Sequence, residues 1–201
     1  MDDLNRLYKG SFFKNRRSLN WRVPIVCGAI QSVLNPKSLI DLGCGNGDLV
    51  KGFLDLGVDA YGVEGTTNCL ASTVIPEGRL SIKDLRIPIV FNDSVRFDLC
   101  ICFEVAEHLE PFAADILVST ICKASDHVLF TAAGPGQGGV HHVNCQPKSY
   151  WVEKFTNMGY WRAPSIEYSI CLKLEESGKH MKKGIKAYYQ NLMYFEKKRL
   201  S

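Results

Sequence analysis

Short apolar runs alternate with amphipathic stretches along most of the chain. The apolar runs have the length of buried strands, and they lie at 38–42, 59–64, 79–83, 97–103 and 127–132. Between them, 47–56, 66–72 and 109–122 have the apolar spacing of helices. Strands that alternate with helices in this way predict a parallel sheet with helices on both faces, which is a doubly wound α/β fold.

Both ends of the chain extend this pattern. Residues 18–34 predict a helix whose start is limited by Pro24, and residues 147–158 predict another, which begins at Pro147. A strand at 160–163, helical material over 166–189 and a strand at 191–197 follow. Such sheets often add a terminal antiparallel strand, so 191–197 is predicted to run antiparallel near an edge. We therefore expect a seven-stranded, mostly parallel sheet within residues 38–201, with residues 1–37 as an N-terminal helical cap of the same domain.

Composition restricts the class of protein. The 201 residues are 46% hydrophobic and 22% charged, values typical of a single globular domain rather than a disordered chain. No stretch approaches the roughly 20 apolar residues that a membrane helix needs. The N-terminus, MDDLNRLYKG, opens with two acids and has no apolar core of a signal peptide. We expect a cytoplasmic protein that does not associate with membranes.

The eight cysteines are spaced in a way that argues against both a disulfide framework and a metal centre. They contain no C-x-x-C pair, and none has a histidine at ligand spacing. Cys100 and Cys102 lie in an apolar run, where a free cysteine acts as a small buried hydrophobe. Reduced, buried thiols and no metal are therefore expected.

Charge is distributed unevenly although the net charge is only +3. Residues 1–37 carry seven Lys and Arg against two acids, and 173–201 carry eight against three, whereas 38–172 carry nine against sixteen. Basic ends that flank an acidic centre have two interpretations: an entrance for an anionic substrate, or simply solvated helix faces. Both stay open from the sequence.

The first predicted strand ends in a glycine-rich turn, Asp41-Leu42-Gly43-Cys44-Gly45-Asn46-Gly47. Glycines here let backbone N–H groups approach a ligand closely. The spacing G-x-G-x-G differs from the G-x-G-x-x-G of dinucleotide-binding turns, which disfavours an NAD-dependent dehydrogenase. Asp41 would repel a pyrophosphate but suits a ligand with a cationic amino group.

This turn resembles the first motif of the class I S-adenosylmethionine-dependent methyltransferases. Three further landmarks follow in the order that this family has: Glu64 in Y-G-V-E-G, Asp84 after the third strand, and the run F-E-V-A-E-H after the fourth. The resemblance implies a Rossmann-like fold, S-adenosyl-L-methionine as cofactor, Glu64 as acceptor for the two ribose hydroxyls, and Asp84 beside the adenine amino group. Purely structural roles stay open as alternatives, with Asp41 as a helix cap and Glu64 as a solvated acid in a turn. The predicted cofactor-binding residues are Asp41, Gly43, Cys44, Gly45, Glu64, Gly65, Asp84, Leu85, Phe103, Glu104 and Val105.

Histidines lie in two segments that leave the carboxyl ends of strands, where ligands bind in open α/β sheets. His108 follows the fourth strand, and His141 and His142 lie in the glycine-rich stretch 133–144. The run G-G-V-H-H-V-N, with Tyr150-Trp151 after it, resembles a subset of small bacterial and viral methyltransferases. The D/N-P-P-Y/F motif of enzymes that methylate exocyclic amines of nucleobases or the side chain of glutamine is not present. His108, His141 and His142 are the candidate catalytic residues, as general bases or as positioning groups. The alternative is that a histidine only braces the loop or the strand turn.

The function that the resemblance implies is methyl transfer in line from the sulfonium of S-adenosylmethionine. We expect a small-molecule acceptor, anionic if the basic ends form its entrance, that is methylated on oxygen or nitrogen by a monomer or homodimer. Methylation of RNA or another macromolecule, and S-adenosylmethionine binding without catalysis, are the alternatives. Nucleic acid is the less expected partner because no RNA-binding module is recognised.

Overall fold

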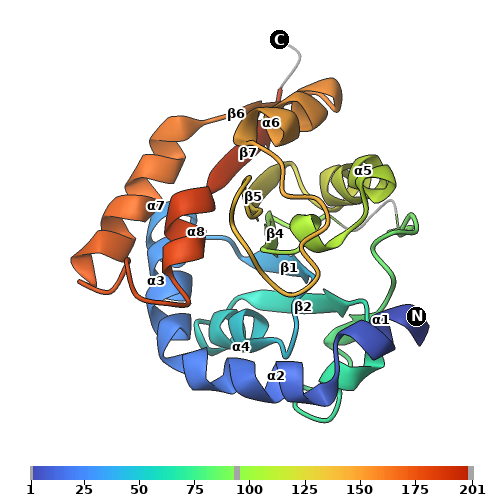
Figure 1. Cartoon of the computed structure of the whole chain (residues 1–201). Helices are drawn as coiled ribbons and strands as arrows, with labels where there is room; N and C mark the ends of the chain where they lie inside the picture. Colours follow the sequence, from blue (N-terminus) through green and yellow to red (C-terminus); the bar gives the residue numbers. More distant parts are fainter. Residues whose placement is uncertain (1, 93–95, 199–201) are drawn as a thin grey trace.

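The computed structural model describes residues 2–92 and 96–198 and contains a seven-stranded sheet (Figure 1). Its strand order is β3-β2-β1-β4-β5-β7-β6. β7 pairs antiparallel with both of its neighbours, and the other pairs are parallel. This confirms the predicted doubly wound, Rossmann-like fold. The strands are β1 (Ser38–Leu42), β2 (Asp59–Glu64), β3 (Leu80–Ile82), β4 (Leu99–Phe103), β5 (His127–Thr131), β6 (Tyr160–Arg162) and β7 (Met193–Lys197).

Helices cover both faces of the sheet (Figure 1). Alternate residues of each strand point to opposite faces, so Leu39 and Ile40 of β1 belong to two different apolar clusters. One cluster packs the sheet against α5 (Ala114–Ala124) and α6 (Lys148–Asn157). The other packs it against α3 (Val23–Leu34), α4 (Asp48–Asp55), α7 (Pro164–Glu176) and α8 (Lys186–Asn191). The central strands are buried on both faces of the sheet, which explains why their sequences are continuous apolar runs.

Three of the helices predicted after the first strand have different bounds in the structure. The predicted helix 66–72 is only a 3₁₀ turn, η2 (Thr67–Cys69). The predicted helix 109–122 begins late, at Ala114, because Pro111 lacks a backbone N–H and starts a separate 3₁₀ turn, η4 (Pro111–Ala113). The segment 166–189 is divided between α7 and α8 by a turn that contains Gly184 at φ 102°.

The N-terminal segment is helical but contains more elements than its sequence pattern shows. α1 (Asp2–Leu7) and α2 (Gly10–Arg16) precede a 3₁₀ helix, η1 (Arg17–Arg22), and α3 begins only at Val23, with Pro24 in its first turn. A proline there costs nothing, since the first N–H groups of a helix have no intrahelical acceptor. Within residues 2–92 and 96–198, no helix combines the length and the apolar character that a membrane crossing requires.

Candidate functional site

The glycine-rich turn after β1 needs glycine for two separate reasons. Gly43, Gly45 and Gly47 have φ of 83°, 60° and 82°, in the left-handed region that a Cβ disfavours. A Cβ on Gly43 would also lie 2.3 Å from a methyl carbon of Val105, in the segment that follows β4. The glycines therefore let the turns after β1 and β4 approach each other at the carboxyl end of the sheet.

Glu64, at the end of β2, holds this turn through its carboxylate. Its Oε2 accepts a hydrogen bond from the N–H of Gly45 at 2.9 Å. Its Oε1 accepts from the N–H groups of Gly65 and Thr66, at 2.8 and 3.2 Å. Charge-assisted hydrogen bonds of this kind are strong and directional, so the carboxylate is fixed in position between the turns after β1 and β2.

A cleft of about 630 Å³ opens over these turns and is closed on one side by α1 and α2. The predicted cofactor residues on its wall are Gly43, Gly45, Glu64, Gly65, Asp84, Leu85, Glu104 and Val105. His108 and Leu109 add to that wall, and the segment formed by α1, α2 and their connection contributes Leu4, Tyr8, Phe12 and Phe13.

Asp84 lines the cleft but is also engaged by a neighbouring arginine. Arg86 donates from Nε and Nη2 to its two oxygens, at 3.0 and 2.7 Å, and from its backbone N–H at 2.9 Å. Burial acts to raise the pKa of Asp84, but the hydrogen bonds from Arg86 outweigh it, so the pKa lies below the usual aspartate value. Arg86 also donates from Nη1 to Asp3 at 2.6 Å, which ties α1 to the edge of the cleft.

A second cavity of about 400 Å³ adjoins the cleft at Gly43 and Gly45, which line both. The remaining predicted cofactor residues, Asp41, Cys44 and Phe103, lie on its wall. Its charged side chains are those of Asp41, Asp48 and Arg22. Asp41 is 3% exposed and Arg22 is 6% exposed. Two buried carboxylates and a buried guanidinium on the wall of one small cavity can bind the amino and carboxylate groups of a zwitterionic ligand.

Arg22 is the residue of this region that the sequence did not single out. Its Nη1 donates to the carbonyl oxygen of Gly184 at 3.4 Å, and its guanidinium lies 5.2 Å from the centre of the Tyr188 ring. Both contacts come from residues more than 160 positions away in the chain. The only signal in the sequence was the general basic character of residues 1–37, which gave no reason to choose Arg22 among seven basic residues.

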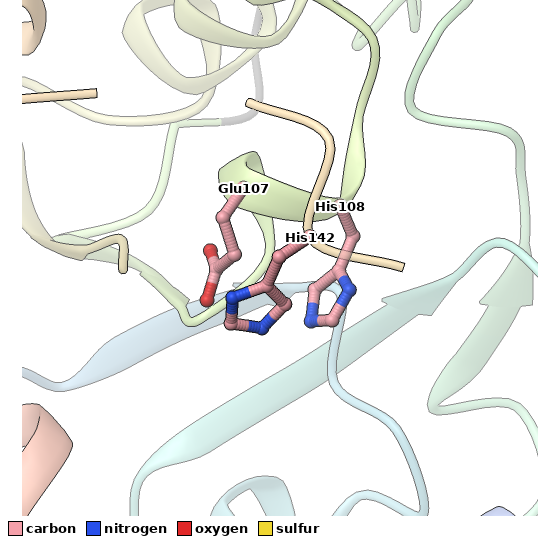
Figure 2. A group of neighbouring side chains, drawn as sticks. All are labelled: Glu107, His108 and His142. Carbon is pink, nitrogen blue, oxygen red and sulfur yellow. The ribbon is translucent and has the colours of Figure 1, made fainter. Parts of the chain in front are cut away.

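Of the three candidate catalytic histidines, the structure brings two together (Figure 2). His108 lines the cleft, and the His142 ring meets it edge-on at 4.8 Å between ring centres. His141 has φ 55° and is neither on the wall of the cleft nor in the group that His108 and His142 form with Glu107. Within the described residues, the sequence-based set of three histidines therefore divides into a pair beside the cleft and one apart from it.

Glu104, which ends β4 in the F-E-V run, is held by a network that the sequence did not predict. Its Oε1 accepts from Asn191 Nδ2 at 3.1 Å, and the same amide nitrogen lies 3.0 Å from Gln137 Oε1. The backbone N–H of Glu104 donates to Thr131 Oγ1 at 2.9 Å. The turn after β4, the loop after β5 and the end of α8 therefore meet at one point beside the cleft.

The eight cysteines are all free, and most are buried. Burial raises the pKa of Cys100 and Cys102 well above the usual value, so both thiols stay protonated and act as apolar packing groups in β4.

The chain resembles known methyltransferases both in sequence and in three-dimensional structure, although no family model matches it. It is 24% identical to the ubiquinone biosynthesis O-methyltransferase of Alkalilimnicola ehrlichii over 128 residues, which are 58% of this chain and 46% of that protein. The chain therefore matches less than half the length of this curated relative. The crystal structure of Streptomyces venezuelae DesVI superposes with a TM-score of 0.66 at 14% identity, covering 96% of this chain and 98% of that one. Haemonchus contortus phospholethanolamine N-methyltransferase 2, solved with phosphomonomethylethanolamine and S-adenosylhomocysteine, gives a TM-score of 0.66 at 17% identity, covering 98% of this chain and 59% of that one.

The chain has the class I methyltransferase fold. The resemblance predicted from the four motifs is confirmed, because the curated relative and the solved neighbour from Haemonchus contortus are both methyltransferases. The predicted cofactor agrees with the demethylated cofactor product bound in that neighbour.

Proposed function

We propose that this chain is an S-adenosylmethionine-dependent methyltransferase that acts on a small-molecule acceptor. The observation that carries the proposal is the placement of all eleven predicted cofactor residues on the walls of two adjoining cavities. Residues far apart in the sequence, from Asp41 to Val105, meet there at the carboxyl end of the sheet, which is where such folds bind their ligands.

The buried charges of the site fit this cofactor part by part. Glu64, fixed at the end of β2 by backbone N–H groups, would accept hydrogen bonds from two adjacent ribose hydroxyls. Asp41 and Arg22 in the second cavity would bind the amino and carboxylate groups of the methionine part. Leu85 and Phe12 offer apolar surface to the adenine ring.

When bound, the cofactor supplies a methyl group whose bond to sulfur breaks as the acceptor's lone pair forms the new bond. The protein must hold the acceptor in line, with the reacting atoms about 3–3.5 Å apart, and keep water away. α1 and α2 cover the cleft, and Tyr8 and His108, which line it, are polar side chains that can orient an acceptor. His142 supports His108 from the edge and is the second candidate for proton removal.

A small acceptor is favoured because the cleft is covered by the N-terminal helices instead of opening as a broad groove. The neighbour from Haemonchus contortus binds phosphomonomethylethanolamine, which is a small and anionic acceptor. The basic character of residues 1–37 would favour an anionic acceptor here as well.

Calorimetry followed by a turnover assay tests this proposal. S-adenosylhomocysteine should bind with a stoichiometry of one, and NAD should not bind. Release of S-adenosylhomocysteine from S-adenosylmethionine should then depend on an acceptor from a panel of phenols, sugars, organic acids and amines. Tight binding without turnover on any acceptor would point instead to a protein that only binds the cofactor, and no binding would refute the proposal.

A second candidate, methylation of a nucleic acid, rests on one surface feature. Leu19, Trp21, Lys179, Lys182 and Lys183 line a groove, with the Lys179 ammonium 5.9 Å from the centre of the Trp21 ring. An aromatic ring among lysines is the arrangement with which proteins hold single strands. Binding of single-stranded RNA that weakens steeply with salt would favour this candidate over a small acceptor.

A further inference from the structure

We propose that Glu107, His108 and His142 form a binding site for a divalent transition-metal ion at the edge of the cleft. Each of the three offers one ligand atom, and these atoms lie within 4.8 Å of one another. Figure 2 shows the three side chains converging from two separate segments of the chain. The spacing of the cysteines predicts no metal site, and it carries no information on a site built from glutamate and histidine.

The backbone fixes the two segments that supply these ligands. Glu107 and His108 are consecutive in the 3₁₀ turn η3 (Ala106–His108), whose last N–H donates to the carbonyl oxygen of Val105 at 3.0 Å. The loop that carries His142 is clamped to this turn, because the carbonyl oxygen of Glu107 accepts from the N–H groups of Val143 and Asn144 at 2.9 and 3.0 Å. The ligands are therefore brought together by hydrogen bonds of the main chain and do not depend on a bound ion.

One ring nitrogen of His142 is engaged by a backbone carbonyl, as is common in metal-binding histidines. His142 Nδ1 lies 2.9 Å from the carbonyl oxygen of Gln137. A carbonyl oxygen can only accept, so Nδ1 carries the proton and Nε2 keeps the lone pair that a metal needs. Cys145 Sγ lies 3.6 Å from the same Nδ1 but donates its own proton to the Gln137 carbonyl, so it does not reverse this assignment.

Gly139 completes the support of this ring. A Cβ at position 139 would lie 2.0 Å from His142 Nε2 and 2.5 Å from each of the two adjoining ring carbons. The main chain thus passes against the imidazole at a distance that only glycine allows. The neighbouring Gly138 has open space around its Cα, so the restriction is specific to position 139.

The ligand set selects the kind of metal ion. One carboxylate and two imidazoles suit Zn²⁺, Mn²⁺ or Fe²⁺ better than Mg²⁺ or Ca²⁺, which prefer oxygen ligands. Glu107 is fully buried, at 0% exposed. Since a buried carboxylate is costly to keep ionised, a divalent cation bound to it would offset part of that cost.

The metal site also selects the acceptor, a step that rests on the proposed methyltransferase function. Three protein ligands leave coordination positions open, and His108 lines the cleft where the acceptor would lie. A hydroxyl group that is coordinated to the metal loses its proton to solvent more readily. Its oxygen keeps a further lone pair, with which it attacks the methyl carbon. The electrons of the carbon–sulfur bond go to sulfur. A coordinated amine nitrogen has no lone pair left. The acceptor is therefore a hydroxyl compound, and the reaction an O-methylation.

The metal content of the purified full-length protein and calorimetry with ZnCl₂ or MnCl₂ alone test the site. We expect one ion per chain, and a dissociation constant raised at least ~100-fold in His142→Ala and in Glu107→Gln, since even indirect support of a metal is worth about 10–100-fold. His141→Ala, which changes a histidine of the same loop outside the group, should bind as the unmodified protein does. Circular dichroism checks that each variant is folded. No binding of either ion, or equal binding by His142→Ala, would overturn the proposal.

A pair of glycine variants tests the same site without removing a ligand. Gly139→Ala should displace the His142 ring and weaken Zn²⁺ binding, whereas Gly138→Ala should not. Equal affinities in the two variants would contradict the assigned orientation of His142 and overturn the site as described.

Binding of S-adenosylhomocysteine, measured separately, distinguishes this inference from the proposed function. Metal binding without cofactor binding would sustain the metal site and refute the methyltransferase. Cofactor binding without metal binding would refute the metal site and leave the proposed methyltransferase function standing. With both present, removal of the ion by a chelator should abolish transfer to hydroxyl acceptors, and transfer to amines in the metal-bound protein would overturn the acceptor assignment.

Discussion

Substitution of Glu64 by glutamine is the most direct test of how the cofactor is held. The carboxylate accepts three backbone N–H groups through its two oxygens, at 2.8–3.2 Å. Glutamine keeps one accepting oxygen and places an NH₂ group where the other accepted. If Oε1 stays with Gly65 and Thr66, this NH₂ faces the N–H of Gly45, and in the complex it meets a ribose hydroxyl that requires an acceptor.

The change therefore removes at least one hydrogen bond to a charged group, worth about 1.5–3 kcal/mol. The dissociation constant of S-adenosylhomocysteine, measured by calorimetry at 25 °C, should rise by about 10- to 150-fold. Glu77→Gln, in the exposed connection between β2 and β3, is the matched control and should leave the affinity unchanged. An affinity of folded Glu64→Gln within twofold of the unmodified protein would refute the assignment of Glu64 to the ribose.

Three further substitutions follow from buried or paired charges. Arg22→Met keeps apolar bulk beside the second cavity but removes the guanidinium, and it should weaken S-adenosylhomocysteine binding by roughly tenfold or more in the same calorimetric assay. Glu167, 7% exposed, accepts from Arg162 at 2.7 and 2.6 Å, so Glu167→Gln should lower the free energy of unfolding in urea by about 1–3 kcal/mol. The hydrogen bond from Arg86 holds the pKa of Asp3 well below its usual range. The stabilisation from this pair is therefore present above the unfolded-state pKa of about 4 and is lost as pH falls through the lower folded value, so Arg86→Ala should move the midpoint of acid unfolding to higher pH. An unmoved midpoint would mean that the pair adds nothing to stability.

The sequence predicted the sheet better than the helices, for a physical reason. All seven predicted strands are present, and β1, β4 and β5 have the clearest signal because a strand buried on both faces is a short continuous apolar run. Helix bounds depend on finer effects. Pro111 delays α5, and the left-handed turn at Gly184 separates α7 from α8. α1 and α2 contain polar residues without a clear apolar period and are placed by contacts with the rest of the domain.

The residues of the candidate site also differ in how well the sequence predicts them. Residues that belong to local motifs, such as Asp41 and Glu64, could be predicted because a single turn of chain carries both their chemistry and their position. Arg22 and Asn191 could not, since each reaches the site only through tertiary contacts. His142 was predicted as a base, but its partner Glu107 was not singled out, because nothing in the sequence shows that the loop 133–144 folds back on η3.

The antiparallel strand β7 has a consequence for the order in which the molecule assembles. It lies between β5 and β6, so β6 hydrogen-bonds to the sheet only through residues 193–197, although it precedes them by about thirty positions. During synthesis the five strands from β1 to β5 have all of their mutual partners as soon as residue 131 has left the ribosome. β6 must wait, and in that interval the free edge of β5 is a template for pairing with another nascent chain. The edge of β5 is therefore open to pairing with another chain from the time residue 131 emerges until Met193 and the rest of β7 follow.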